Sequence, residues 1–199
     1  MTPPDRILRN DLAQIAQWIP ARSRVLDLGC GDGTLLHWLN HHQACSGVGV
    51  EISDENVLAC IERGVPVVQA DIDQGLSMFG RGRFDVVVLA QALQATRETE
   101  RVLREIGTIG HECIVSIPNF GHWTTITSLL RGFMPVNKRL PYAWYNTPNQ
   151  HFATLNDFEA FLVDRGFQIM ERAYLDENQQ VHRLANLRAT LAVYRFRLK

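Results

Sequence analysis

The feature that most constrains the fold is a regular alternation of short apolar segments and helical segments along the first 117 residues. We predict strands that begin at Arg24 and at 47–51, 65–69, 84–90 and 113–117, and helices over 5–19, 34–42, 54–63 and 99–106. The segment 84–90 is a continuous, mostly β-branched run, typical of a strand buried on both faces. Such alternation predicts right-handed crossovers and a parallel sheet with helices on both faces.

The C-terminal part closes the pattern. Residues 156–165 show helical spacing, with Phe158, Phe161 and Leu162 on one face, and 168–174 and 190–199 are predicted strands. We expect Pro20 to stop the first helix, Asp54 to cap the helix 54–63 and Gly64 to end it. With 199 residues and no internal repeat, the chain is expected to form one α/β domain, residues 1–199, around a seven-stranded, mostly parallel sheet.

Composition excludes several classes of protein. Hydrophobic residues make up 46% and the formal net charge is −1, which argues against disorder and against a general nucleic-acid binder. The longest apolar runs are far shorter than the roughly 20 residues of a membrane span, and the opening residues do not resemble a secretory signal. Cys30, Cys45, Cys60 and Cys113 have no zinc-ligand spacing, so we expect no metal and reduced thiols in a cytoplasmic protein.

A glycine-rich turn, Gly29-Cys30-Gly31-Asp32-Gly33, follows the first predicted strand. Such a turn lets the backbone approach a ligand. Glu51 ends the second strand, where a carboxylate can accept two bonds from a ribose diol, and Asp71 follows the third, where it can meet an adenine amino group. Asp27 lies at the end of the first strand, where its charge would repel a pyrophosphate but suits an ammonium group.

The motifs VLDLGCGDG, GVGVEIS, QADID and FDVVVLAQAL resemble the class I S-adenosylmethionine-dependent methyltransferases over about residues 23–115 and the closing strands. The resemblance implies that the region of Asp27 and Gly29 meets the methionine part of the cofactor, that Glu51 holds the ribose, and that Asp71 and Ile72 flank the adenine. The predicted site for S-adenosylmethionine or S-adenosylhomocysteine also includes Cys30, Gly31, Ile52 and Gln91. The alternative is a domain that keeps the fold and has lost the ligand.

No catalytic residue can be assigned. The segment Gln91-Ala-Leu-Gln94 after the fourth strand offers no general base. His111, His122 and His151 are the histidines expected near the strand ends, and a lone histidine is more often structural. Cys30 is expected to pack rather than to act as a nucleophile.

Residues 119–152, which we call the insert, interrupt the alternating pattern. They hold seven of the 17 aromatic residues, and helical spacing occurs only around 125–131. From Cys113 to Asn156 there is no Asp or Glu, whereas Arg131, Lys138 and Arg139 are basic. Aromatic and arginine side chains are typical of protein interfaces. The alternative is a buried aromatic lid over the sheet, which we favour for Phe120, Phe133 and Phe152 and leave open for Trp123, Trp144 and Tyr145.

A narrower resemblance rests on the segments NFGHW, RGFMP, LPYAWYNTPN and HF of the insert, which are similar to the methionine-biosynthesis family MetW. The resemblance covers the whole chain and implies a partner or activator of a homoserine O-acyltransferase of the MetX type. The candidate partner or acceptor surface consists of His122, Trp123, Arg131, Tyr142, Trp144, Tyr145, Asn146 and His151. The alternative is an active small-molecule methyltransferase in which His122, Tyr142 or His151 orients the acceptor.

Overall fold

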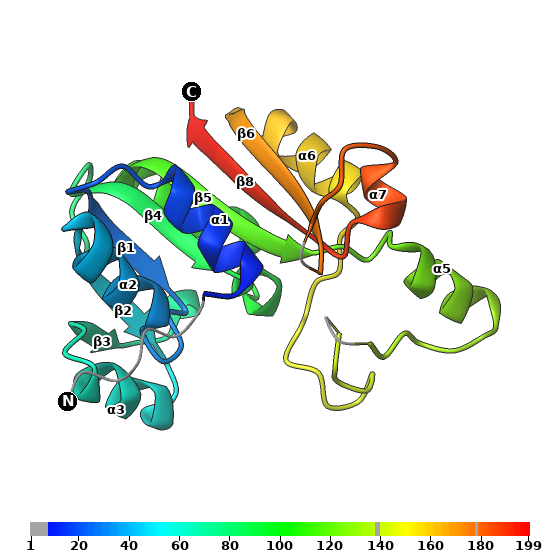
Figure 1. The fold of residues 1–199 in the computed structure, drawn as a ribbon, viewed down its shortest axis with the longest axis horizontal. Helices are drawn as coiled ribbons and strands as arrows, with labels where there is room; N and C mark the ends of the chain where they lie inside the picture. The colour runs from blue at the N-terminus through cyan, green and yellow to red at the C-terminus, as the bar shows by residue number, and fades with distance from the viewer. Residues whose placement is uncertain (1–7, 138–139, 178) are drawn as a thin grey trace.

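The computed structural model of the chain describes residues 8–137, 140–177 and 179–199. Their centre is one sheet with strand order β3-β2-β1-β4-β5-β8-β6-β7 (Figure 1). The strands are β1 (Arg24–Leu28), β2 (Ser46–Glu51), β3 (Val67–Gln69), β4 (Phe84–Ala90), β5 (Gly110–Pro118), β6 (Phe167–Asp176), β7 (Gln179–Gln180) and β8 (Leu191–Leu198). The predicted α/β fold with a mostly parallel sheet is confirmed, and the eighth strand is the two-residue β7.

Strand direction separates the sheet into two parts. The strands from β1 to β5 run parallel, and β8 is inserted antiparallel between β5 and β6. The carboxyl ends of the five parallel strands therefore meet at one edge of the sheet. The turn Gly29–Gly33 and the loops after Glu51, Gln69 and Ala90 leave the sheet at that edge.

The helices are α1 (Asn10–Trp18), α2 (Thr34–Gln43), α3 (Asp54–Glu62), α4 (Thr99–Ile109), α5 (Trp123–Leu130), α6 (Leu155–Asp164) and α7 (Ala185–Arg188), with short 3₁₀ turns η1 (Ile72–Gln74) and η2 (Leu93–Ala95). The expected first turn of the first helix, residues 5–7, lies outside the described residues. One expectation was wrong: Ser53, rather than Asp54, occupies the N-cap position of α3, and Asp54 lies in its first turn. None of the helices in the described residues is long and apolar enough to cross a membrane.

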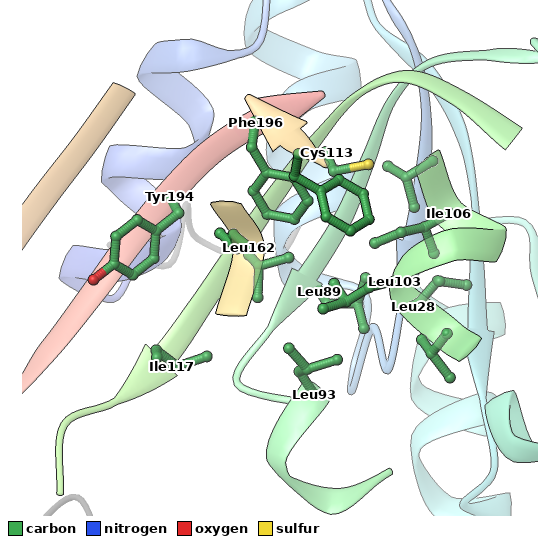
Figure 2. Packing of buried hydrophobic residues seen from close by; sticks show 14 of the residues in the cluster. Leu28, Leu89, Leu93, Leu103, Ile106, Cys113, Ile117, Leu162, Tyr194 and Phe196 are labelled. Carbon is green, nitrogen blue, oxygen red and sulfur yellow. The ribbon is translucent and has the colours of Figure 1, made fainter. Parts of the chain in front are cut away.

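Two hydrophobic clusters pack the helices against the sheet, one on each face. Strand β4 alternates between them: Val87 and Leu89 join the cluster under α4 and α6, whereas Val86 and Val88 join the cluster under α1 and α2. In the first cluster Leu103 of α4 lies near Leu28 and Leu89 of the sheet, and all three are fully buried (Figure 2). Burial on both faces explains why the sequence of this strand is a continuous apolar run.

Candidate functional site

The glycine turn after β1 brings the backbone close to the loop after β4. Gly29, Gly31 and Gly33 have φ values of +71°, +55° and +73°, a region that favours glycine. A Cβ atom on Gly29 would lie 2.7 Å from Cβ of Ala92. The backbone N–H of Gly29 also donates to the carbonyl of Val50 at 2.8 Å, which ties the turn to β2. Glycine at position 29 is thus required by both conformation and space.

Glu51 connects the glycine turn to the start of α3. Its carboxylate is nearly buried and accepts the N–H of Gly31 at 2.8 Å on Oε2, and those of Ile52 and Ser53 at 2.9 and 3.0 Å on Oε1. A carboxylate offers about four acceptor sites. About one site on Oε2 therefore stays available for a ligand hydroxyl, beside the exposed side chain of Ile52.

Asp27 is an acid held in an unfavourable environment. Its side chain is only 2% exposed, and Oδ1 has no hydrogen-bond partner among the residues that the structure describes. Burial is the main reason that the pKa of Asp27 is raised to about 7; the charge of Arg9 opposes the shift, and the charge of Glu51 adds a smaller part of it. A buried oxygen without a donor and a carboxyl that titrates near neutrality suit a cationic group of a ligand.

Two neighbouring cavities share Gly29. The Asp27 cavity, of about 550 Å³, is also lined by Arg9, Cys30, Gly31 and Thr34. The Asp71 cavity, of about 330 Å³, is lined by residues from the ends of β2 and β3, the loop after β4 and the insert: Glu51, Ile52, Asp71, Ile72, Ala92, Ala95, Thr96, Arg97 and Gln150. Both volumes are in the range of small-molecule sites. The first cavity can hold a zwitterionic end of a ligand, and the second offers carboxylates to hydroxyl and amino donors.

Most of the predicted cofactor residues lie together in these cavities. Asp71 fixes its loop by accepting the N–H of Asp73 at 2.9 Å, so that Ile72 faces the same cavity. Burial raises the pKa of the Cys30 thiol well above its usual range, consistent with a packing role. Gln91 differs, because it lines neither cavity and its Nε2 donates to Oδ2 of Asp11 at 2.7 Å.

The residues of the site region that the sequence reasoning missed include Arg9, Asp11 and Gln150. Asp11 lies fully buried in the first turn of α1 and accepts hydrogen bonds from Arg9, at 3.2 Å, and from Gln91. A charged residue between Leu8 and Leu12 on the buried face of an amphipathic helix was the available signal. No local pattern marks Arg9 or Gln150, which reach the cavities only through the tertiary fold.

The insert carries most of its large apolar side chains in solvent. Trp123 is 56% exposed, Trp144 72% and Tyr145 73%, and Tyr142 is also exposed; we call these four residues the insert surface. The expected burial was wrong for Phe133 and Phe152, which are exposed, because the insert extends beyond the carboxyl end of β5 instead of folding over the sheet (Figure 1). Phe120 is half-buried against Phe152. Lys138 and Arg139 lie outside the described residues.

The remaining candidates of the insert differ in their surroundings. His122 is buried and caps α5, since its Nδ1 accepts the N–H of Thr124, and burial lowers its pKa. Arg131 and Asn146 are exposed, and Nε2 of His151 lies 3.3 Å from the carbonyl oxygen of Arg97. His111 was wrongly expected near the strand ends of the site, because it lies at the start of β5, on the opposite edge of the sheet.

The strand order, the glycine turn and the acidic residues after β2 and β3 define a class I methyltransferase fold. The chain belongs to the MetW family, since the family model described as "Methionine biosynthesis protein MetW" matches residues 9–196. Solved S-adenosylmethionine-dependent methyltransferases share the fold. One from Mesorhizobium loti is 18% identical with a TM-score of 0.68 over 94% of this chain and 99% of its own. A putative one from Listeria monocytogenes is 15% identical with a TM-score of 0.70 over 95% and 98%.

A relative from Rhodopirellula baltica carries the name "Bifunctional methionine biosynthesis protein MetXA/MetW". It is 35% identical over 192 residues, which include 89% of this chain. The match spans only 30% of the length of the relative, so most of the relative has no counterpart in this chain.

Proposed function

We propose that this protein binds S-adenosylmethionine or S-adenosylhomocysteine at the edge of the sheet and acts as a partner and activator of a homoserine O-acyltransferase of the MetX type. The observation that carries the nucleoside half of the proposal is Asp27, a buried carboxyl whose Oδ1 has no donor among the described residues although it borders a cavity. Buried polar atoms in folded proteins nearly always have a hydrogen-bond partner, so the oxygen of Asp27 that lacks one in the described part of the chain supports a ligand that donates to it.

In this proposal each residue of the two cavities holds one part of the nucleoside. The carboxylate of Asp27 accepts hydrogen bonds from the ammonium group, and Arg9 of the same cavity forms an ion pair with the carboxylate of the amino-acid end. Glu51 accepts a ribose hydroxyl, and Asp71 and Ile72 flank the adenine, with Ile52 packing on the ring. When bound, S-adenosylmethionine would supply an activated methyl group, whereas S-adenosylhomocysteine would act as a ligand alone.

The partner half of the proposal is supported by the insert surface and by the relative from Rhodopirellula baltica. Tryptophan and tyrosine side chains are typical of binding hot spots, and the exposure of their large apolar surface to water is energetically unfavourable. The sequence of the insert contains no acidic residue, so it suits a partner with an apolar, acid-rimmed face. The relative joins the names MetXA and MetW in one chain, which supports a physical association of the two activities.

Co-purification and acyltransferase assays test the association directly. The organism's own MetX-type protein should co-purify with this chain, and its rate of homoserine acylation should rise when the chain is added. The double variant Trp144→Ala/Tyr145→Ala should lose both effects. The matched control Leu58→Ala, an exposed apolar residue on α3, should retain both. A MetX-type protein that neither binds nor changes its rate would refute the partner role.

A second candidate function is methyl transfer to a small molecule. It is favoured by His151, an exposed imidazole beside Arg97 and Gln150, two residues that line the Asp71 cavity. Incubation with methyl-labelled S-adenosylmethionine and a cell extract of metabolites tests it. Labelled product that disappears in His151→Ala would support it, and no product across acceptors would reject it.

A further inference from the structure

The end of the insert is attached to the loop that follows β4. The backbone N–H groups of Gln150 and His151 both donate to the carbonyl of Gln94, at 2.9 and 3.1 Å. Gln94 lies in η2, and its side-chain Nε2 donates to the carbonyl of Gln91 at 2.7 Å. The ring of His151 makes a further contact with the carbonyl of Arg97. These contacts link the chain segment that follows Trp144 and Tyr145 to η2.

The same loop forms a wall of the Asp71 cavity. Ala92, Ala95, Thr96 and Arg97 line that cavity together with Gln150 of the insert. The wall is therefore hydrogen-bonded to Gln150 and His151, which follow Trp144 and Tyr145 closely in the chain. The contacts of Gln94 are the route by which a ligand at the wall and a partner at Trp144 and Tyr145 would affect each other.

Two features of this loop are energetically unfavourable. Gln91 has a φ of +56°, a left-handed conformation that is uncommon for a residue other than glycine. Oε1 of Gln94 is buried and finds no hydrogen-bond donor within the described parts of the chain. Strained backbone and unsatisfied buried atoms concentrate at ligand clamps and switch regions.

We propose that the insert supplies part of the nucleoside site through Gln150, and that nucleoside binding tightens the binding of the partner to the insert surface. This inference rests on the proposed function. A nucleoside in the Asp71 cavity orders Gln150 and η2, and a partner that docks on an already ordered insert loses less conformational entropy. Because the coupling is a difference of binding free energies, the partner must tighten nucleoside binding by the same factor.

Hydrogen–deuterium exchange of the full chain, with and without saturating S-adenosylhomocysteine, tests the first half. The amides of Gln150 and His151 should exchange at least about fivefold more slowly with the ligand, as expected for a coupling of ordinary size. Calorimetry on the same sample separates the outcomes. No heat of binding refutes the proposed function, whereas binding without slower exchange at these two amides refutes this inference alone.

A pair of variants at one position tests the attachment. Gln150→Pro removes the N–H that bonds to Gln94, whereas Gln150→Ala keeps it. At saturating S-adenosylhomocysteine, Gln150→Pro should abolish the ligand-dependent protection of His151. Gln150→Ala, which lacks the side chain at the cavity but keeps the N–H, should retain that protection at saturation, with thermal melting as a check of folding. Equal protection in both variants would overturn the attachment. If Gln150→Pro does not fold, the exchange data of the unaltered chain still decide.

The second half is tested on the complex with the MetX-type protein. The Kd of the complex should fall at least about fivefold when S-adenosylhomocysteine is added, and the effect should disappear in Glu51→Ala, which removes the ribose acceptor but not the insert. An equal Kd with and without the ligand would refute the coupling.

Discussion

Replacement of Asp27 by asparagine should stabilise the protein, and more so at high pH. The carboxyl is buried, and its pKa is raised from 3.8 to about 7. Because the folded protein holds this proton more tightly than the unfolded chain, the contribution of Asp27 to stability falls as the pH rises from about 4 to about 7 and is constant above about 7. At about 1.4 kcal/mol per pKa unit, the full loss is about 4 kcal/mol. Asparagine has the same shape and carries no charge, so Asp27→Asn avoids this loss.

Urea denaturation followed by circular dichroism at pH 5 and pH 8 measures the effect. The free energy of unfolding of Asp27→Asn, relative to the unaltered protein, should increase by roughly 2–3 kcal/mol between these pH values, since at pH 5 only part of the loss has occurred. The matched control is Asp85→Asn. The pKa of Asp85 is lowered by its hydrogen bond with Arg24, so its titration lies below this window and the difference should stay flat. A pH-independent difference for Asp27→Asn would refute the claim that the buried carboxyl titrates near neutrality.

Three further substitutions probe the site and the core. Arg9→Ala should weaken S-adenosylhomocysteine binding by about 1 kcal/mol in calorimetry and leave the affinity for 5′-methylthioadenosine, which has no amino-acid end, unchanged. Equal losses of affinity for both ligands would contradict the role of Arg9 as partner of the carboxylate. Gly29→Ala should lower the free energy of unfolding by about 1–3 kcal/mol and weaken nucleoside binding, because of its positive φ and the close contact with Ala92; unchanged stability would contradict the strained turn. Leu103→Ala should lower the free energy of unfolding by about 2–5 kcal/mol in urea denaturation without changing nucleoside affinity, since it leaves a void in the core away from the Asp27 and Asp71 cavities. A loss below about 1 kcal/mol would contradict close packing there.

The fold was largely predictable because its signals are local. Strand β4 has the predicted bounds, since a β-branched run buried on both faces has no helical alternative. The neighbouring β3 begins at Val67 instead of Val65, because Pro66 lacks the N–H that a strand ladder needs. Strand β7 has only two residues, too few for any periodicity, and was missed.

The Asp27 and Asp71 cavities were predictable to the extent that strand ends line them. Parallel strands place Asp27, Glu51 and Asp71 at one edge of the sheet whatever the loops do. Arg9 and Gln150 come from segments that reach the two cavities only in the folded chain, and no neighbouring sequence pattern indicates this position. Composition likewise identified the insert as unusual, but the exposure of Phe133 depends on where the insert lies in space.

The central proposal is that the Asp27 and Asp71 cavities together bind the nucleoside. Titration calorimetry of S-adenosylhomocysteine into the purified protein at pH 7.5 tests it most directly. We predict one binding site per chain, with affinity weakened by about 1–3 kcal/mol in Glu51→Ala, which loses a charged hydrogen-bond acceptor. Absence of binding by the unaltered protein, or equal affinity in the variant, would contradict the account.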